Sequence, residues 1–123
     1  MVGAKVLFDT NILIDHMSGI GLAGAELGRY HDRAISIITW LEVMAGSSSE
    51  DESRIRAFLT AFRCLPLTTE VAERSFMVRR ERRLKLPDAI ILATAETADR
   101  LLITRNTRDF PANDPGIRIP YRL

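Results

Sequence analysis

Apolar residues along the chain fall into short runs whose spacing alternates between that of strands and that of helices. The segment 5–8 is typical of a short buried strand, and the β-branched run 34–38 predicts a second one. Shorter apolar segments at 64–67, 101–104 and 117–119 predict three more strands. Helices are predicted in the intervals between them.

The clearest helical pattern lies between residues 52 and 62. One apolar face is formed there by residues spaced i, i+3, i+4 and i+7, namely Ile55, Phe58, Leu59 and Phe62. Ser49 and Glu52 have the spacing of a capping box at its start. Further helices are expected at 12–17, at 39–45 with Gly46 as the residue after its end, from Thr69 through the arginines, and at 88–99 behind Pro87. Glycines between 19 and 28 leave the helicity of that stretch open.

Strands that alternate with helices indicate an α/β fold in which helices flank a mostly parallel central sheet. The length of 123 residues suits a single domain, 1–123. No apolar run approaches the roughly 20 residues needed to cross a bilayer, so no membrane association is expected. Asp9 and Asp15 interrupt the N-terminal apolar stretch and argue against a signal peptide. The single cysteine, Cys64, excludes an internal disulfide and favours a cytoplasmic location.

Charge is distributed unevenly although the net charge is only +1. Residues 1–62 carry 5 basic and 8 acidic side chains, whereas residues 63–123 carry 12 and 8. Much of the basic excess is in one predicted helix and comes from Arg79, Arg80, Arg82 and Arg83. Such a cluster is either a surface that binds nucleic acid or simply the solvated face of a helix.

Acidic and amide residues recur where predicted strands end and helices begin. Asp9 follows the first strand, Glu42 lies in the first turn of the helix after the second, and Asp88 starts a buried helix. Asn106 and Asp109 follow the strand 101–104. Each alone is explained by helix capping, but ligand sites of parallel sheets gather at these strand ends. Clustered carboxylates repel unless a cation such as Mg²⁺ or Mn²⁺ joins them, and that chemistry suits phosphodiester hydrolysis.

Four segments carry a resemblance to a known family. They are 7–12 (LFDTNI), 36–42 (SIITWLE), 86–95 (LPDAIILATA) and 102–110 (LITRNTRDF). In this order they resemble the PIN-domain ribonucleases, in particular the VapC toxins of type II toxin–antitoxin modules. The resemblance spans nearly the whole chain and implies a PIN-like fold.

The resemblance also implies a role for individual residues. Asp9 and Asp88 would be the main ligands of Mg²⁺ or Mn²⁺, and Glu42 would bind the metal directly or through water. Small polar residues would orient these carboxylates, namely Thr10, Asn11, Ser36 and Thr104. Asn106 stands where the family often has a fourth acidic residue, and Asp109 is a second candidate for that carboxylate.

The activity implied is that of a metal-dependent endoribonuclease that leaves 5′-phosphate and 3′-hydroxyl ends. The four arginines of the basic helix would hold the RNA backbone. The implied partners are a second copy of the chain and a cognate antitoxin of the VapB kind, through which alone DNA would be contacted. A basic group of the antitoxin would mask the acids, and Ile12, Ile14 and Met17 would anchor its peptide.

Two other functions are kept open. One is a PIN-like module that binds RNA or a partner without cleaving, which the neutral Asn106 leaves possible. A phosphoaspartyl enzyme would use Asp9 as its nucleophile, but Asn11 stands where such enzymes need a second aspartate, and Leu13 also departs from their pattern.

Overall fold

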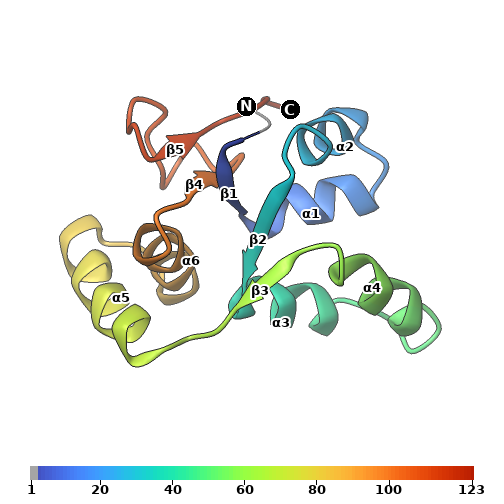
Figure 1. Cartoon of the computed structure of the whole chain (residues 1–123), viewed down its shortest axis with the longest axis horizontal. Coiled ribbons are helices and arrows are strands. Elements are labelled where there is room, and N and C mark those ends of the chain that lie inside the picture. Colours follow the sequence, from blue (N-terminus) through green and yellow to red (C-terminus); the bar gives the residue numbers. More distant parts are fainter. Residues whose placement is uncertain (1–2) are drawn as a thin grey trace.

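The computed structural model describes residues 3–123 as five strands and six helices (Figure 1). In chain order they are β1 (Lys5–Phe8), α1 (Thr10–Met17), α2 (Gly21–Leu27), β2 (Asp32–Ser36), α3 (Ile37–Ala45), α4 (Glu52–Leu59), β3 (Arg63–Leu65), α5 (Thr69–Arg82), α6 (Leu86–Thr97), β4 (Leu101–Ile103) and β5 (Ile117–Arg118). None of the helices in this part of the chain is long and apolar enough to cross a membrane.

The strands form one parallel sheet in the order β3-β2-β1-β4-β5. β1 is central, with Leu7 beside Ala34 of β2 on one side and beside Leu102 of β4 on the other. The α/β fold predicted from the sequence is therefore confirmed. Because all strands point the same way, their carboxyl ends meet at one edge of the sheet.

Each face of the sheet is covered by a different set of helices (Figure 1). Alternate residues of β1 point to opposite faces, so Val6 and Phe8 pack with α1, α2 and α4, whereas Leu7 packs with α5 and α6. The same alternation divides Leu102 from Ile103 in β4. Burial on both faces explains why these short strands are almost wholly apolar.

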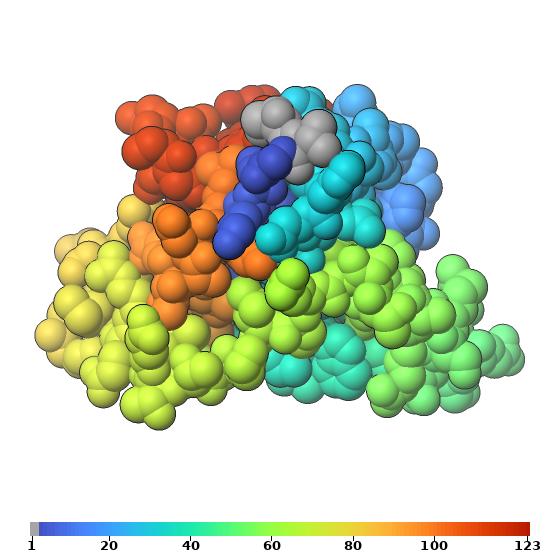
Figure 2. Space-filling view, in the orientation of Figure 1, coloured from blue at the N-terminus to red at the C-terminus, as the bar shows by residue number. Residues whose placement is uncertain are grey.

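β3 forms one edge of the sheet, and the chain that leads from it to α5 runs over the surface. In Figure 2 this green to yellow-green segment crosses the lower front of the molecule. Arg63 and Cys64 of the strand are exposed, as a short edge strand with a charged residue allows.

The structure differs from the sequence prediction at the starts of α3 and α4, and it decides one stretch whose helicity the sequence left open. The predicted capping box of Ser49 and Glu52 is wrong. Asp51 is the residue before α4 and its side chain does not cap the helix, while Ser48 accepts the Asp51 N–H at 3.2 Å. β2 ends at Ser36, whose Oγ accepts the N–H of Ile38, so 37–38 belong to α3 rather than to the strand. The glycine-rich stretch does form a helix, α2.

The turn between α5 and α6 fixes where the second of these helices begins. Arg83 ends α5 in the left-handed conformation, with φ 56°, and Leu84 after it is buried in the core. α6 then starts at Leu86 with Pro87 in its first turn, where a missing N–H costs nothing. Asp88 thus lies in the first turn of α6, at the carboxyl edge of the sheet.

Candidate active site

The predicted catalytic and metal-binding residues meet at the carboxyl edge of β1 and β4. A cavity of about 340 Å³ is lined by all three of the acids expected to bind a metal, Asp9, Glu42 and Asp88. A cavity of about 400 Å³ shares Asp88 with it and includes Asp109. Asn11, Arg105 and Asn106 line both. We refer to these two cavities together as the acidic cleft.

Asp9 is the buried centre of the acidic cleft, with only 4% of its surface exposed. Its Oδ1 accepts the Thr10 N–H at 2.7 Å, and its Oδ2 accepts the Thr104 hydroxyl at 2.7 Å and the Asn11 amide at 3.4 Å. Burial raises the pKa of Asp9 to about 6, against the hydrogen bonds from Thr104 and Thr10; the charges of Asp88 and Glu42 raise it further. The carboxylate is thus held firmly, but none of its hydrogen-bond partners within residues 3–123 is positively charged.

Glu42 reaches the acidic cleft from α3 and is held by a hydroxyl. Thr10 donates its hydroxyl hydrogen to Oε1 of Glu42 at 2.7 Å, and the hydroxyl of Thr39 lies 2.9 Å from that of Thr10. Ser36 was expected to orient a carboxylate, but its hydroxyl accepts the Ile38 N–H at 3.0 Å and caps α3. Ser36 therefore acts on the helix that carries Glu42 rather than on the acid itself.

Asp88 is half-buried in the first turn of α6. Burial raises the pKa of its carboxyl group, and the charges of Asp109 and Glu42 add to this, while Lys85 opposes it. Repulsion of this kind is the electrostatic signature of carboxylates grouped around a place for a cation.

Asn106 and Asp109, which follow β4, are joined by two hydrogen bonds. The Asn106 amide donates to Oδ2 of Asp109 at 2.9 Å, and the Asp109 N–H donates to Oδ1 of Asn106 at 3.2 Å. Asp109 is also the largest charge influence on Asp88. The side chain of Asn106 therefore steadies Asp109, and it is Asp109 that brings a fourth negative charge to the acidic cleft.

The donor set of the acidic cleft suits a hard cation that keeps part of its water. Its acidic oxygens come from Asp9, Glu42, Asp88 and Asp109, and no histidine or cysteine lines it. Within residues 3–123 no three acidic, histidine or cysteine side chains are close enough to hold an ion on their own. Mg²⁺ and Mn²⁺ fit such a set, because they bind through one or two carboxylates and several waters.

The four arginines expected to bind RNA lie outside the acidic cleft. Arg79, Arg80, Arg82 and Arg83 are exposed on the last turn of α5 or just after it. Arg82 pairs with Asp114 at 2.9 Å, and the guanidinium of Arg80 lies 4.3 Å from the ring centre of Phe76. The basic residues that line the acidic cleft are instead Lys85, Arg105 and Arg108.

The three apolar residues expected to anchor an antitoxin peptide differ in how exposed they are. Ile12 is fully buried in the core, so that part of the expectation is wrong. Met17 is half-buried and packs against the same core. Ile14 is 41% exposed and lines the smaller cavity beside the acids.

The sequence analysis missed a buried ion pair next to the acids. Arg105 binds both oxygens of Asp15 through Nε and Nη2, and the Tyr121 hydroxyl donates to Oδ2 of Asp15 at 2.8 Å. Asp15 is buried, and these bonds, that of Arg105 foremost, lower its pKa against the effect of burial. One sequence signal existed, since Asp15 is a charge on the otherwise apolar side of a helix that follows the first strand.

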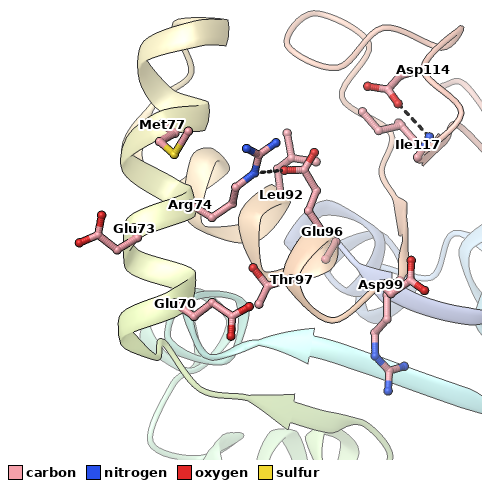
Figure 3. A pocket seen from close by; sticks show the side chains of 13 residues that line it. Glu70, Glu73, Arg74, Met77, Leu92, Glu96, Thr97, Asp99, Asp114 and Ile117 are labelled. Atoms are coloured by element: carbon pink, nitrogen blue, oxygen red, sulfur yellow. Dashed lines mark hydrogen bonds and ion pairs between the residues drawn. The ribbon is translucent and has the colours of Figure 1, made fainter.

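A larger cavity, of about 710 Å³, lies between α5, α6 and the chain before β5 (Figure 3). Its wall carries an ion pair between Arg74 and Glu96 at 2.8 Å, with Glu70 and Glu73 nearby on α5. It contains none of the predicted site residues. The predicted acids therefore gather in the acidic cleft rather than in this cavity.

Comparison with known proteins agrees with this arrangement. Residues 6–114 match the PIN domain family. The chain belongs to the PIN-domain family. The match spans the acidic cleft from Asp9 to Asp109 and confirms the resemblance indicated by the sequence motifs.

Individual PIN-domain proteins are similar over most of their length. Ribonuclease VapC10 of Mycobacterium tuberculosis is 32% identical over 114 residues, which cover 86% of each protein. A toxin–antitoxin complex from Klebsiella pneumoniae contains a chain with 49% identity and a TM-score of 0.92, covering 97% of this chain and 100% of that one. FitAcB from Neisseria gonorrhoeae, at 24% identity and a TM-score of 0.80, covers the same shares and shares the fold.

Proposed function

We propose that this PIN-domain protein is the toxin of a toxin–antitoxin pair and cleaves RNA as a metal-dependent endoribonuclease. The observation that carries the proposal is the grouping of Asp9, Glu42 and Asp88 around one cavity, with the pKa of two of them raised. The similarity to ribonuclease VapC10 and to the chain of the Klebsiella toxin–antitoxin complex supports the choice of RNA and of an antitoxin.

In this mechanism Asp9 and Asp88 would hold Mg²⁺ or Mn²⁺, and Glu42 would bind it directly or through water. The chemistry that such an ion would supply is a lowered pKa of a water molecule and an offset of charge on the phosphate oxygens. Thr104 and Asn11 keep the Asp9 carboxylate in place, and Thr10 does the same for Glu42. Asp109, steadied by Asn106, supplies the fourth carboxylate, so the neutral Asn106 does not leave the cleft short of charge.

The remaining expectations belong to the same proposal. A VapB-like antitoxin would close the acidic cleft, and DNA would be contacted only through that antitoxin. The chain would pair with a second copy, and both would act in the cytoplasm. Sedimentation of the purified protein at several concentrations measures whether the dimer forms.

The test is cleavage of a structured RNA by the purified protein with Mn²⁺, with Mg²⁺ and with EDTA. We expect cutting with either ion, none with EDTA, and 5′-phosphate ends. Asp88→Asn should abolish cutting, whereas Glu70→Gln, a matched change in the larger cavity, should leave it intact. Cutting that persists in EDTA, or in the Asp88→Asn protein, would contradict the proposal.

Binding without cutting is the outcome expected of the alternative, a PIN-like module without catalysis. The phosphoaspartyl alternative has less support, because both oxygens of Asp9 already accept hydrogen bonds and Asn11 is occupied in holding Thr104 and Arg105. A phosphoryl-donor labelling assay distinguishes it, since only that mechanism leaves phosphate on the protein.

A further inference from the structure

Arg105 is a cation fixed at the wall of the acidic cleft. Its side chain is about one-third exposed, and it lines both cavities that contain Asp88. Its backbone N–H donates to Oδ1 of Asn11 at 3.1 Å, which ties it to the residue that holds Asp9. The position follows from β4, since Arg105 comes one residue after Thr104 at the carboxyl edge of the sheet.

The guanidinium is held by one of its two edges. Nε and Nη2 bind the carboxylate of Asp15, which is buried on α1 and also accepts the Tyr121 hydroxyl. Nη1 donates to no residue within 3–123. A guanidinium carries five N–H groups in a planar fork, so the edge formed by Nη1 and Nη2 keeps donors for a second anion.

We propose that Arg105 is a substrate-binding residue whose free guanidinium edge donates to the non-bridging oxygens of an RNA phosphate in the acidic cleft. The inference rests on the proposed ribonuclease function and adds a residue to it. The two non-bridging oxygens of a phosphate match the two parallel N–H groups of this guanidinium edge, as in other arginine–phosphate pairs. Because Asp15 and Tyr121 already fix the side chain, binding costs little conformational entropy. Asp15 and Tyr121 are then positioning residues that act through Arg105.

A second ion pair in the molecule provides a matched control. Arg118 binds both oxygens of Glu26 through Nε and Nη2, at 2.7 and 3.1 Å, and Tyr30 donates to the same carboxylate at 2.8 Å. Glu26 is buried like Asp15, and the Arg118 side chain is 28% exposed against 33% for Arg105. Arg118 lines neither cavity of the acidic cleft. The two arginines therefore have the same structural role but only one faces the candidate site.

The experiment compares Arg105→Lys with Arg118→Lys. Lysine keeps the positive charge but has only one nitrogen in its side chain. It therefore cannot bind both oxygens of the buried carboxylate and a phosphate at the same time, as the planar guanidinium can. Binding of a short fluorescein-labelled single-stranded RNA is measured in EDTA, and steady-state cleavage is measured with Mn²⁺. Melting temperatures of both variants report the loss of the ion pair itself.

We expect both variants to melt at similarly lowered temperatures, and only Arg105→Lys to bind RNA about tenfold more weakly. The loss should be in KM, with kcat nearly unchanged, because the contact holds the substrate before and during reaction. If the parent cuts RNA and both variants bind it equally well, Arg105 is purely structural and the inference fails. If the parent binds RNA through Arg105 but never cuts it, the proposed function fails and the inference stands.

A measurement on the unmodified protein covers the case in which a variant does not fold. The Nε–H signals of Arg105 and Arg118 are followed by nuclear magnetic resonance while the same RNA is added in EDTA. The Arg105 signal should shift and that of Arg118 should stay. Equal response of the two signals, or none at Arg105 under saturation, would overturn the inference.

Discussion

At the scale of single residues, Asp9 combines two roles that the sequence left as alternatives. It precedes α1 in an extended conformation and accepts the Thr10 N–H, as a capping residue does. Its other oxygen binds Thr104 and lies in the acidic cleft. A cap fixes the rotamer of the carboxylate, so the structural role serves the chemical one.

The pKa of Asp9 predicts how stability changes with pH in the absence of metal. A folded-state pKa of about 6, above the ordinary 3.8, means that the folded protein favours the protonated acid. The resulting stability is fully present below pH 4, falls as pH rises to 6, and is absent above it. Asp9→Asn imitates the protonated form. Its free energy of unfolding should therefore exceed that of the parent by up to about 3 kcal/mol above pH 6.

Urea unfolding in EDTA between pH 4 and pH 8 measures this difference. Asp32→Asn is the opposite control, because the bond with Arg100 lowers the pKa of Asp32. The neutral variant should be less stable than the parent by a nearly constant amount across this range, and the deficit should shrink only as pH falls below 4. A constant difference between the parent and Asp9→Asn over this range would show that Asp9 titrates normally.

Asp88→Asn should keep the fold and lose the response to metal. The two side chains have nearly equal volume, and neutralising one of several repelling carboxylates favours the metal-free protein. A metal at 100 times its Kd stabilises a protein that binds it by about 2.7 kcal/mol. Thermal melts should show Mn²⁺ raising the Tm of the parent strongly and that of the variant little. Equal shifts in the two proteins would remove Asp88 from the metal ligands.

At the scale of elements, two glycines that follow helices adopt different backbone conformations. Gly46 follows α3 with φ −84°, a conformation that any residue adopts, and a Cβ there would meet only backbone oxygens at 3.6 Å or more. Gly19, between α1 and α2, has φ +88°. The left-handed conformation expected of a residue after a helix is thus absent at Gly46.

Replacing each glycine by alanine should therefore have effects of opposite sign. Gly46→Ala should stabilise by about 0.4–1 kcal/mol, since alanine restricts the unfolded chain without straining the folded one. Gly19→Ala should destabilise by about 1 kcal/mol, since alanine is strained at positive φ. Urea unfolding of both variants at pH 7 checks this, and a loss of stability in Gly46→Ala would contradict it.

The basic end of α5 should contribute to RNA binding through charge alone. Arg79 and Arg80 are exposed and line neither cavity of the acidic cleft, so they would meet phosphates beyond it. Arg79→Ala/Arg80→Ala should lower the slope of log affinity against log salt by about 0.7–1 for each lost contact. A salt titration of RNA binding in EDTA measures the slope.

The control for α5 is Arg54→Ala/Arg63→Ala, which removes two exposed arginines from α4 and β3. That protein should keep the slope of the parent. Equal slopes in all three proteins would assign Arg79 and Arg80 to a solvated face or a partner surface.

At the scale of the whole molecule, the acidic cleft and its rim predict how an antitoxin would bind. The cleft attracts a guanidinium, and the exposed Ile14 beside it offers apolar surface for the adjoining peptide. Ile14→Ala should weaken binding of the cognate antitoxin about tenfold, and Leu67→Ala, a similarly exposed leucine outside the cleft, should not. Calorimetry of the pair measures both. A complex with no basic antitoxin residue near Asp9, Glu42 and Asp88 would contradict the charge-masking part.

Much of the fold and of the candidate site could be predicted because its signals are local. Period-two and period-3.6 patterns placed the strands and helices within a few residues, and the position of Asp9 and Asp88 at element ends brought them to one edge of a parallel sheet. Glu42, expected in the first turn of its helix, lies in the second turn of α3, because that helix already begins at Ile37. The capping box failed because α4 begins only at Glu52, so Ser49 lies in the turn before the helix and Ser48 accepts the Asp51 N–H instead. Two residues of β-branched sequence at 37–38 entered a helix, since the cap at Ser36 outweighed their preference for a strand.

The sequence by itself determined the α/β fold, the family and the acids of the cleft, because each depends on residue types at short spacings along the chain. Only the tertiary structure decided which polar and charged side chains pair. Arg105 and Asp15 are 90 residues apart, and Thr104 and Asp9 are 95 apart. These contacts depend on the register of β4 against β1 and on the packing of α1, and no local pattern encodes either. A buried charge can only be interpreted once its partner is known, since burial alone makes the ionised form costly.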